Sequence, residues 1–167
     1  TARDPKYFTY SQGCEPDLKP VIGDARLTFA REPDGIYDLI IVDAYSSDAI
    51  PIHLATQQAM AIYKSKLAPQ GAVVVHVSNR HLDLAPVVAN VAQSLGLAAY
   101  LREDNSAGDL LTTLKANARL VVLAREPADT GSVAWNWAPL PPDRSSALWT
   151  DDYSNILGIM LRKKFGL

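Results

Sequence analysis

Residues 39–42 read Leu-Ile-Ile-Val, a short apolar run that stops abruptly at Asp43. An unbroken run rich in β-branched residues is typical of a strand buried on both faces, as in a parallel sheet covered by helices. A small, polar segment follows, and a helical pattern begins near Leu54. Ligands of open α/β sheets bind outside the carboxyl ends of the strands. The sequence therefore predicts that Asp43 lies at the edge of the sheet where a binding site forms.

The two aspartates of this region also have simpler interpretations. Asp43 could merely end the strand or cap a neighbouring turn, and Asp48 could be an ordinary loop carboxylate that faces water. The position of Asp43 and the composition of the loop behind it agree, so we favour a functional role for Asp43. For Asp48 both interpretations stay open.

Apolar runs and helical stripes alternate along the rest of the chain. Such alternation indicates one α/β domain over residues 1–167, with a mostly parallel sheet and helices on both faces. The strands at 39–42 and 73–77 are expected to be adjacent at the centre, joined by a right-handed crossover. The other expected strands are 20–22, 97–101 and 120–124, and the expected helices are 25–31, 54–67, 84–95, 151–164 and a short candidate after Asp109.

Residues that commonly begin and end helices support these boundaries. Asp24, Asp83 and Thr150 are the expected N-caps of their helices, and Gly96 is the expected terminator of the helix that precedes it.

A long segment without periodicity, residues 126–147, contains four prolines. It is expected to run over the surface, with Trp135 and Trp137 pinning it to the body of the domain.

Composition limits the classes of function. With 167 residues and 48% hydrophobic content the chain can build a real core, and a net charge of -2 gives no general attraction for nucleic acid or an anionic membrane surface. The single cysteine, Cys14, excludes an internal disulfide and fits a reducing compartment, so we expect a cytoplasmic location. No apolar run approaches the length of a membrane span, and the N-terminus does not read as a signal peptide.

The three histidines invite a metal interpretation. The spacings of His53, His76 and His81 form no compact ligand set, and we predict no metal site. His53 at a helix start and His76 at a strand end both fall near the presumed cleft. Structural or hydrogen-bonding roles are favoured for them.

Four stretches taken together resemble the spermidine synthase-like branch of the class I S-adenosylmethionine-dependent methyltransferase fold. They are Gly-Asp-Ala-Arg-Leu at 23–27, the stretch 43–53, His-Val-Ser-Asn-Arg at 76–80 and Trp-Thr-Asp-Asp-Tyr at 149–153. The resemblance covers nearly the whole chain, from about Pro5 to the last helix. It implies a Rossmann-like sheet, and S-adenosylmethionine or its decarboxylated form as co-substrate.

The resemblance also implies roles for individual residues. In that family the Gly-Asp-Ala position lies by the adenine, so Asp24 and Ala25 would contact the cofactor. Asp43 would help to deprotonate an attacking amine, because a protonated amine has no lone pair until a carboxylate accepts its proton. The residues expected to contact the acceptor are Tyr45, Ser46, Ser47, Asp48 and His53, although Tyr45 has simple packing as its alternative.

The loop departs from the polyamine-making members of the family. Their loop reads Asp-x-x-Asp-Pro, whereas here the second carboxylate, Asp48, comes two positions late. A second carboxylate would stabilise a cationic polyamine. The departure puts polyamine specificity in doubt.

The family's Gly-rich loop has no counterpart, since no Gly-x-Gly occurs in the sequence. By resemblance Thr1 falls just after the family's second strand, so the chain is expected to be the C-terminal part of the family domain. Half of the cofactor cleft would then be missing, and we expect little or no binding of the co-substrate.

Three interpretations of the function stay open. The parent is an aminopropyltransferase acting on a small amine and inactive as this fragment, or a methyltransferase acting on another acceptor, or the chain is a non-catalytic relic or interaction module. The family's first strand normally lies between the strands at 20–22 and 39–42. Either these two close up against each other, or an apolar sheet edge is exposed and another chain covers it, so we expect self-association into a homo-oligomer.

Overall fold

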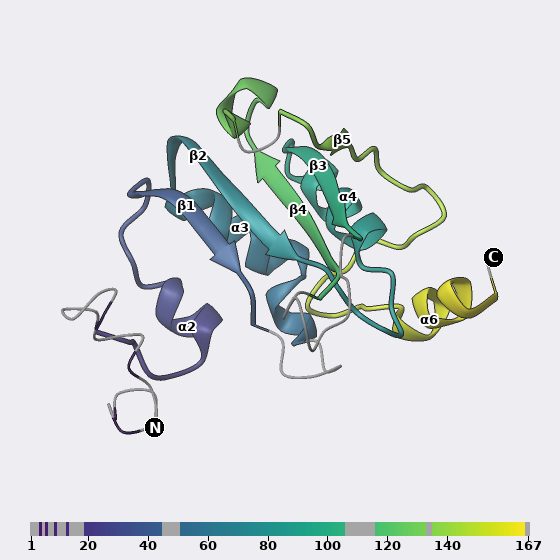
Figure 1. The fold of residues 1–167 in the computed structure, drawn as a ribbon, viewed down its shortest axis with the longest axis horizontal. Helices are drawn as coiled ribbons and strands as arrows, with labels where there is room; N and C mark the ends of the chain where they lie inside the picture. Colours follow the sequence, from purple (N-terminus) through teal and green to yellow (C-terminus); the bar gives the residue numbers. More distant parts are fainter. Residues whose placement is uncertain are drawn as a thin grey trace. The chain divides into compact units, whose positions relative to one another are not determined.

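The computed structural model describes residues 4, 6, 9, 13, 19–44, 51–105, 116–132 and 135–165 (Figure 1). The backbone divides into two compact units, Thr1–Arg31 and Glu32–Leu167. Each unit is described by itself, and the expectation of one continuous domain over residues 1–167 stays a prediction.

The first unit contains helix α2 (Ala25–Phe29), which begins as the sequence predicted. The Asp24 carboxylate accepts a hydrogen bond from the Leu27 N–H at 2.9 Å, so the expected N-cap is confirmed. The expected strand at 20–22 is wrong, because these residues form no strand and Ile22 is 85% exposed. An apolar run becomes a strand only when it pairs with another and buries a face, and no described strand pairs with this one.

The second unit contains one five-stranded sheet in the order β1-β2-β4-β3-β5. Its strands are β1 (Tyr37–Val42), β2 (Leu67–His76), β3 (Ala98–Asp104), β4 (Ala118–Ala124) and the two-residue β5 (Ala138–Pro139).

The pairings show where the expectation of a mostly parallel sheet was wrong. β1 and β2 pair in parallel, whereas β2–β4, β3–β4 and β3–β5 are antiparallel. β1, β2 and β3 therefore point the same way, and β4 runs back between β2 and β3. Asp104 and Ala118 are partners at the edge where β3 ends and β4 begins, so the connection returns at the same edge instead of crossing the sheet.

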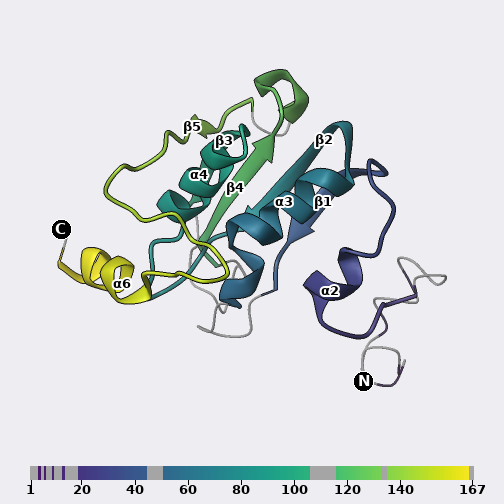
Figure 2. The ribbon, with the colours of Figure 1, turned by 180° about the vertical axis from the view of Figure 1, so that it is seen from behind.

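β1 pairs with β2 as expected, and Figures 1 and 2 show that the connection through α3 (Gln57–Lys66) is right-handed. β1 nevertheless forms the outer strand of the described sheet, not its centre. Ile40 is buried, but Leu39 and Ile41 on the other face are 48% and 65% exposed. The expectation of burial on both faces is therefore wrong for this strand.

Two helices cover the same face of the sheet in the described part. α3 and α4 (Ala85–Ser94) lie behind the strands in Figure 1 and in front of them in Figure 2. The expected helix at 54–67 starts late, because a short 3-10 turn, η1 (Ile52–Leu54), precedes Thr56, whose hydroxyl accepts the Ala59 N–H. The core under these helices includes Val73, Val75, Val121, Leu123, Met60, Val87, Val88 and Val91.

The two ends of α4 differ in how well they match the residues expected to begin and end this helix. Gly96, at a φ of 66°, ends the helix as predicted, because this left-handed conformation favours glycine. The expectation that Asp83 caps the helix is wrong. Leu84 occupies the N-cap position, and the Asp83 carboxylate instead binds Arg119, which lies far along the chain.

A smaller cluster packs on the opposite face of the sheet. Trp137 lies against this cluster, as expected, because β5 pairs with β3 immediately after it. Trp135 lies in a turn before β5 and is 84% exposed, so the expectation that it pins the segment is wrong. The cluster consists of Ala72, Val122 and Ala124, with Val74, Tyr100 and Trp137 packed against it.

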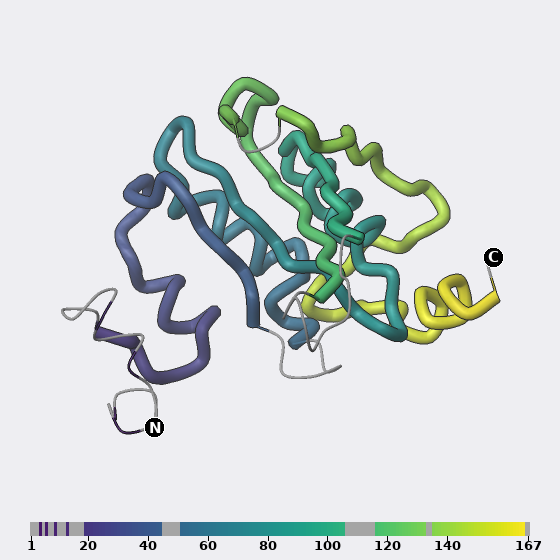
Figure 3. The backbone as a smooth tube through the Cα atoms, viewed as in Figure 1, coloured from purple at the N-terminus to yellow at the C-terminus, as the bar shows by residue number. Residues whose placement is uncertain are grey.

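Beyond β4 a short 3-10 turn, η2 (Pro127–Thr130), comes before β5, and the chain then passes α4 on its way to α3 (Figure 3). Trp149 is fully buried, and its carbonyl accepts the Gln57 N–H at the start of α3. Thr150 pairs with Tyr153 in an isolated bridge, so it does not cap the last helix, and α6 (Ile156–Phe165) begins later than expected.

Among the helices in the described ranges, none combines the length and the apolar character that a membrane span requires.

Candidate functional site

The carboxyl ends of β1 and β2 lie side by side, because these strands are parallel neighbours. Asp43 follows the last residue of β1, and His76 is the last residue of β2. β4 is antiparallel to β2, so its first residues lie at the same edge. The predicted position of Asp43 at the carboxyl edge of the sheet is therefore confirmed.

A chain of hydrogen bonds crosses this edge. His76 Nδ1 lies 2.8 Å from Asp43 Oδ1, and His76 Nε2 lies 2.6 Å from Ser78 Oγ. Ser78 Oγ also accepts the main-chain N–H of Arg119 at 2.7 Å. We call the first three residues the Asp43–His76–Ser78 relay. The hydrogen-bonding role favoured for His76 is thereby confirmed.

With a neutral His76, the donors and acceptors of the relay are consistent with one arrangement of protons. An ionised Asp43 carboxylate can only accept, so the imidazole proton of neutral His76 belongs on Nδ1. His76 Nε2 then has a lone pair, to which the Ser78 hydroxyl donates. The Asp43 side chain is 62% exposed and that of His76 is 28% exposed, so one end of the relay faces solvent.

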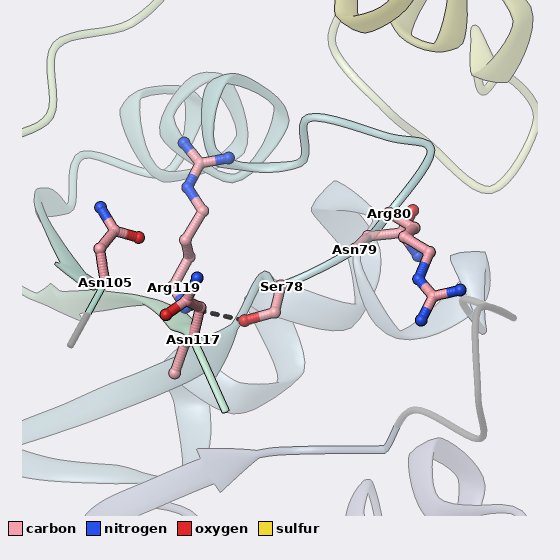
Figure 4. Close-up of a pocket in the computed structure, with 7 residues that line it drawn as sticks. Ser78, Asn79, Arg80, Asn105, Asn117 and Arg119 are labelled. Atoms are coloured by element: carbon pink, nitrogen blue, oxygen red, sulfur yellow. Dashed lines mark hydrogen bonds between the residues drawn. The ribbon is translucent and has the colours of Figure 1, made fainter. Parts of the chain in front are cut away.

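An open cavity of about 550 Å³ lies beside Ser78. Cavities of this size, within about 300–1,000 Å³, hold small molecules. In Figure 4 the Ser78 hydroxyl points toward the Arg119 main chain, while the Arg119 guanidinium points away from it. No carboxylate belongs to the described lining, which consists of Ser78, Asn79, Arg80, Asn105, Asn117, Ala118 and Arg119.

Ion pairs hold Arg119 in place. Its Nη1 donates to Asp83 Oδ1 at 2.8 Å. Its Nε lies 2.7 Å from Glu103 Oε1, an ion pair without the geometry of a hydrogen bond. These two carboxylates offset the guanidinium charge and fix the start of β4, where the Arg119 N–H meets Ser78.

The turn after Ser78 is braced from two sides. Asn79 Oδ1 accepts the N–H groups of His81 and Leu82, both at 2.8 Å. From α6, Lys163 Nζ donates to the carbonyl oxygens of Asn79 and Leu82. The last helix therefore supports the loop that presents Ser78 to the cavity.

Several predicted site residues are not part of this arrangement. His53 lies exposed in η1. Asp24 and Ala25 lie in the first unit, where Asp24 caps α2. The proposed contacts of these three residues with acceptor or cofactor stay predictions. The candidate helix after Asp109 and the predicted acceptor contacts Tyr45, Ser46, Ser47 and Asp48 lie outside the described residues.

Ser78 and Arg119 are the members of the site that sequence reasoning missed. A signal existed for Ser78, because residues two apart on an extended chain point to the same side, and His76 was already placed at the strand end. Nothing local signals the Arg119 contact, since it uses a main-chain N–H from a residue 41 positions away. Across the described residues, no three His, Cys, Asp or Glu side chains are grouped as a metal site would require.

No family model and no curated protein sequence matches the chain. Solved structures do match it. MnmC2 from Aquifex aeolicus is 19% identical with a TM-score of 0.50, over 90% of this chain and 46% of that one. A probable spermidine synthase from Corynebacterium glutamicum is 16% identical with a TM-score of 0.51, over 84% and 57% of the two chains. Spermidine synthase from Thermotoga maritima is 12% identical with a TM-score of 0.52, and the match covers 95% of this chain and 53% of that one.

A further match is a spermidine synthase in complex with the transition-state analogue AdoDATO, 12% identical with a TM-score of 0.50, over 95% of this chain and 52% of that one. The chain thus spans about half the length of the solved chains it matches. Identities this low establish the fold alone. The predicted resemblance is confirmed at that level: the chain has the Rossmann-like class I methyltransferase fold that spermidine synthases share.

Proposed function

We propose that this chain supplies the acceptor side of a transferase that moves an aminopropyl group from decarboxylated S-adenosylmethionine to a small amine. The observation that carries the proposal is the Asp43–His76 contact of 2.8 Å at the carboxyl edge of the sheet. The shared fold with spermidine synthases supports it.

The residues present fit an acceptor site better than a complete co-substrate site. The exposed Asp43 carboxylate can hold an ammonium group, and His76 behind it can share the proton that the amine must lose. The co-substrate, when bound, supplies an electrophilic carbon beside its sulfonium. The amine nitrogen becomes a nucleophile only after its proton has passed to the Asp43–His76 pair.

The direct test is a titration of the labelled 1–167 chain with putrescine, followed by the ring signals of His76 in NMR spectra. We expect saturable shifts in the wild type. Asp43→Asn should weaken binding about 10- to 100-fold, because a hydrogen bond to a charged group is worth roughly 1.5–3 kcal/mol. Asp38→Asn is the matched control, since Asp38 is an exposed aspartate of the same strand. Equal binding by the Asp43 variant would remove Asp43 from the acceptor site.

The same substitution predicts a kinetic result in an intact enzyme that contains this chain. Asp43→Asn should lower the rate of transfer by roughly 10²-fold or more, because it removes the proton acceptor. Thermal stability should change little, since an exposed carboxylate at a strand end supports no core.

A second candidate is methyl transfer to a neutral or anionic acceptor. The observation that favours it is the described part of the cavity lining, which includes Arg80 and no carboxylate, and so does not suit a polycation. Product analysis by mass spectrometry, with S-adenosylmethionine and its decarboxylated form supplied separately to the intact enzyme, distinguishes the two reactions.

A further inference from the structure

We propose that Ser78 is a nucleophile activated by His76 and Asp43, and that the cavity beside it takes an ester or a comparably activated acyl compound. This activity goes beyond the transfer reaction proposed above, because it needs neither a sulfonium compound nor an amine.

The relay meets the geometric conditions for an activated serine. A nucleophilic hydroxyl needs a base within hydrogen-bond reach, and the base needs a third group that fixes its tautomer and orientation. Ser78 Oγ lies 2.6 Å from His76 Nε2, and His76 Nδ1 lies 2.8 Å from Asp43 Oδ1. The two ring nitrogens therefore bind the nucleophile on one side and the carboxylate on the other.

The main chain holds the hydroxyl in place. Ser78 Oγ accepts the Arg119 N–H at 2.7 Å, and the Arg119 carbonyl accepts the Val77 N–H at 2.9 Å. The end of β2 is thus bonded in both directions to the start of β4. This N–H occupies one lone pair of the oxygen and leaves the other for attack on an electrophile.

The surroundings of Ser78 suit a reaction in which negative charge develops. The cavity opens beside the hydroxyl (Figure 4), and its described lining includes Asn79, Asn105 and Asn117 and no carboxylate, while the Arg80 guanidinium points away from Ser78. Amide donors around a carbonyl stabilise the oxyanion that forms when it is attacked, and the absence of a carboxylate from the described lining avoids repulsion of that oxyanion.

The proposed step balances without a further reactant besides water. Ser78 Oγ bonds to the carbonyl carbon of the ester while its proton passes to His76 Nε2. The bond to the leaving alkoxide then breaks, and the alkoxide takes that proton from His76. Water, deprotonated by the same nitrogen, releases the acid and restores the Ser78 hydroxyl. Asp43 stays ionised throughout and stabilises the imidazolium, so Asp43 is a positioning residue in this reaction.

The test is covalent labelling of the 1–167 chain with an alkyl fluorophosphonate, which transfers its phosphonyl group to an activated serine and releases fluoride. We expect one label per chain, located on Ser78 by peptide mass spectrometry, and slow hydrolysis of p-nitrophenyl acetate. Ser78→Ala should abolish both. His76→Gln should slow labelling by about 10²-fold or more, the usual effect of losing a general base.

Two controls make the outcome decisive. Ser94→Ala removes an exposed serine of α4 whose hydroxyl donates to the Val91 carbonyl, and it should label at the wild-type rate. Asp43→Asn should change the ¹H–¹⁵N signal of the His76 Nδ1 proton and slow labelling, whereas a purely structural role would leave the labelling rate of a folded variant unchanged. Near-UV circular dichroism checks that each variant is folded.

A folded wild-type chain that takes up no label, or a label found on another residue, would overturn the proposal. Neither result bears on amine binding, which the putrescine titration measures in the absence of any acylating compound. Failure here and failure of the proposed transferase function are therefore distinguishable.

Discussion

At the scale of single residues, Asp143 shows how the side chain and main chain of one residue connect three parts of the second unit. It accepts hydrogen bonds from the Ser145 N–H and hydroxyl, at 2.9 and 2.6 Å, and from the Ser146 hydroxyl. Arg162 of α6 forms an ion pair with the Asp143 carboxylate at 3.2 Å. The Asp143 carbonyl accepts a hydrogen bond from the Asn90 side chain of α4, and the Asp143 N–H donates one to the same side chain. The hydrogen bond from the Ser145 hydroxyl, above all, holds the pKa of Asp143 below its usual value.

This lowered pKa gives stability a predictable dependence on pH. An aspartate whose pKa is lower in the folded state stabilises the fold above its ordinary value of 3.8, and the contribution is lost as pH falls from there through the folded-state pKa. We expect Asp143→Asn to flatten the acid branch of a plot of the free energy of unfolding against pH. Urea denaturation between pH 5 and the acid limit of folding checks it. An unchanged acid branch in the variant would contradict this account.

At the scale of elements, β1 is an outer strand of the described sheet and carries exposed apolar side chains. Its register places Leu39 beside Ala72 and Ile41 beside Val74, on the face where Trp137 covers the neighbouring strands. That cover stops before β1, so both side chains remain exposed. An outer strand with exposed apolar side chains and one unpaired edge is a surface for association with another strand.

We therefore expect the 1–167 chain to self-associate through β1. Ile41→Lys should shift the equilibrium toward monomer, because a charge at the centre of an apolar contact opposes association, and it should cost little stability at a position 65% exposed. Sedimentation equilibrium measures the change. Ile22→Lys, the same substitution at an exposed isoleucine outside the sheet, should leave the association unchanged. A wild-type chain that is monomeric at all concentrations would refute the expectation.

At the scale of the whole molecule, the chain spans about half the length of the solved chains whose fold it shares. Its sequence contains no Gly-x-Gly that would let the backbone approach the amino-acid end of a sulfonium ligand. The predicted contacts of Asp24 and Ala25 with adenine would supply only a part of the affinity.

We accordingly expect the 1–167 chain to bind S-adenosylmethionine and its decarboxylated form poorly and to catalyse no transfer alone. Each missing charge-assisted hydrogen bond is worth roughly 1.5–3 kcal/mol, so the loss of several weakens binding by orders of magnitude. Isothermal titration calorimetry with both compounds tests this directly. Micromolar binding of either compound would show that the residues present are sufficient.

The sequence by itself determined the features that depend on neighbouring residues. The apolar runs predicted β1 and β2, the helical stripe predicted α4, and Asp24 and Gly96 marked helix ends, because periodicity, caps and left-handed glycines are local properties. It also placed Asp43 and His76 at strand ends, where a site was expected.

Only the tertiary structure decided how these elements combine. Three features depend on contacts between residues that are far apart in the sequence. They are the outer position of β1, the antiparallel placement of β4 between β2 and β3, and the ion pair of Asp83 with Arg119 in place of a helix cap. The Asp43–His76–Ser78 relay also depends on which strands are neighbours in the sheet. His76 meets Asp43 because β2 lies in parallel register with β1, and Ser78 meets the Arg119 N–H because β4 pairs with the other side of β2. Periodicity along one strand carries no information about which strand will pair with it, and that pairing brought Asp43 and the Arg119 N–H to the local His76–Ser78 hydrogen bond.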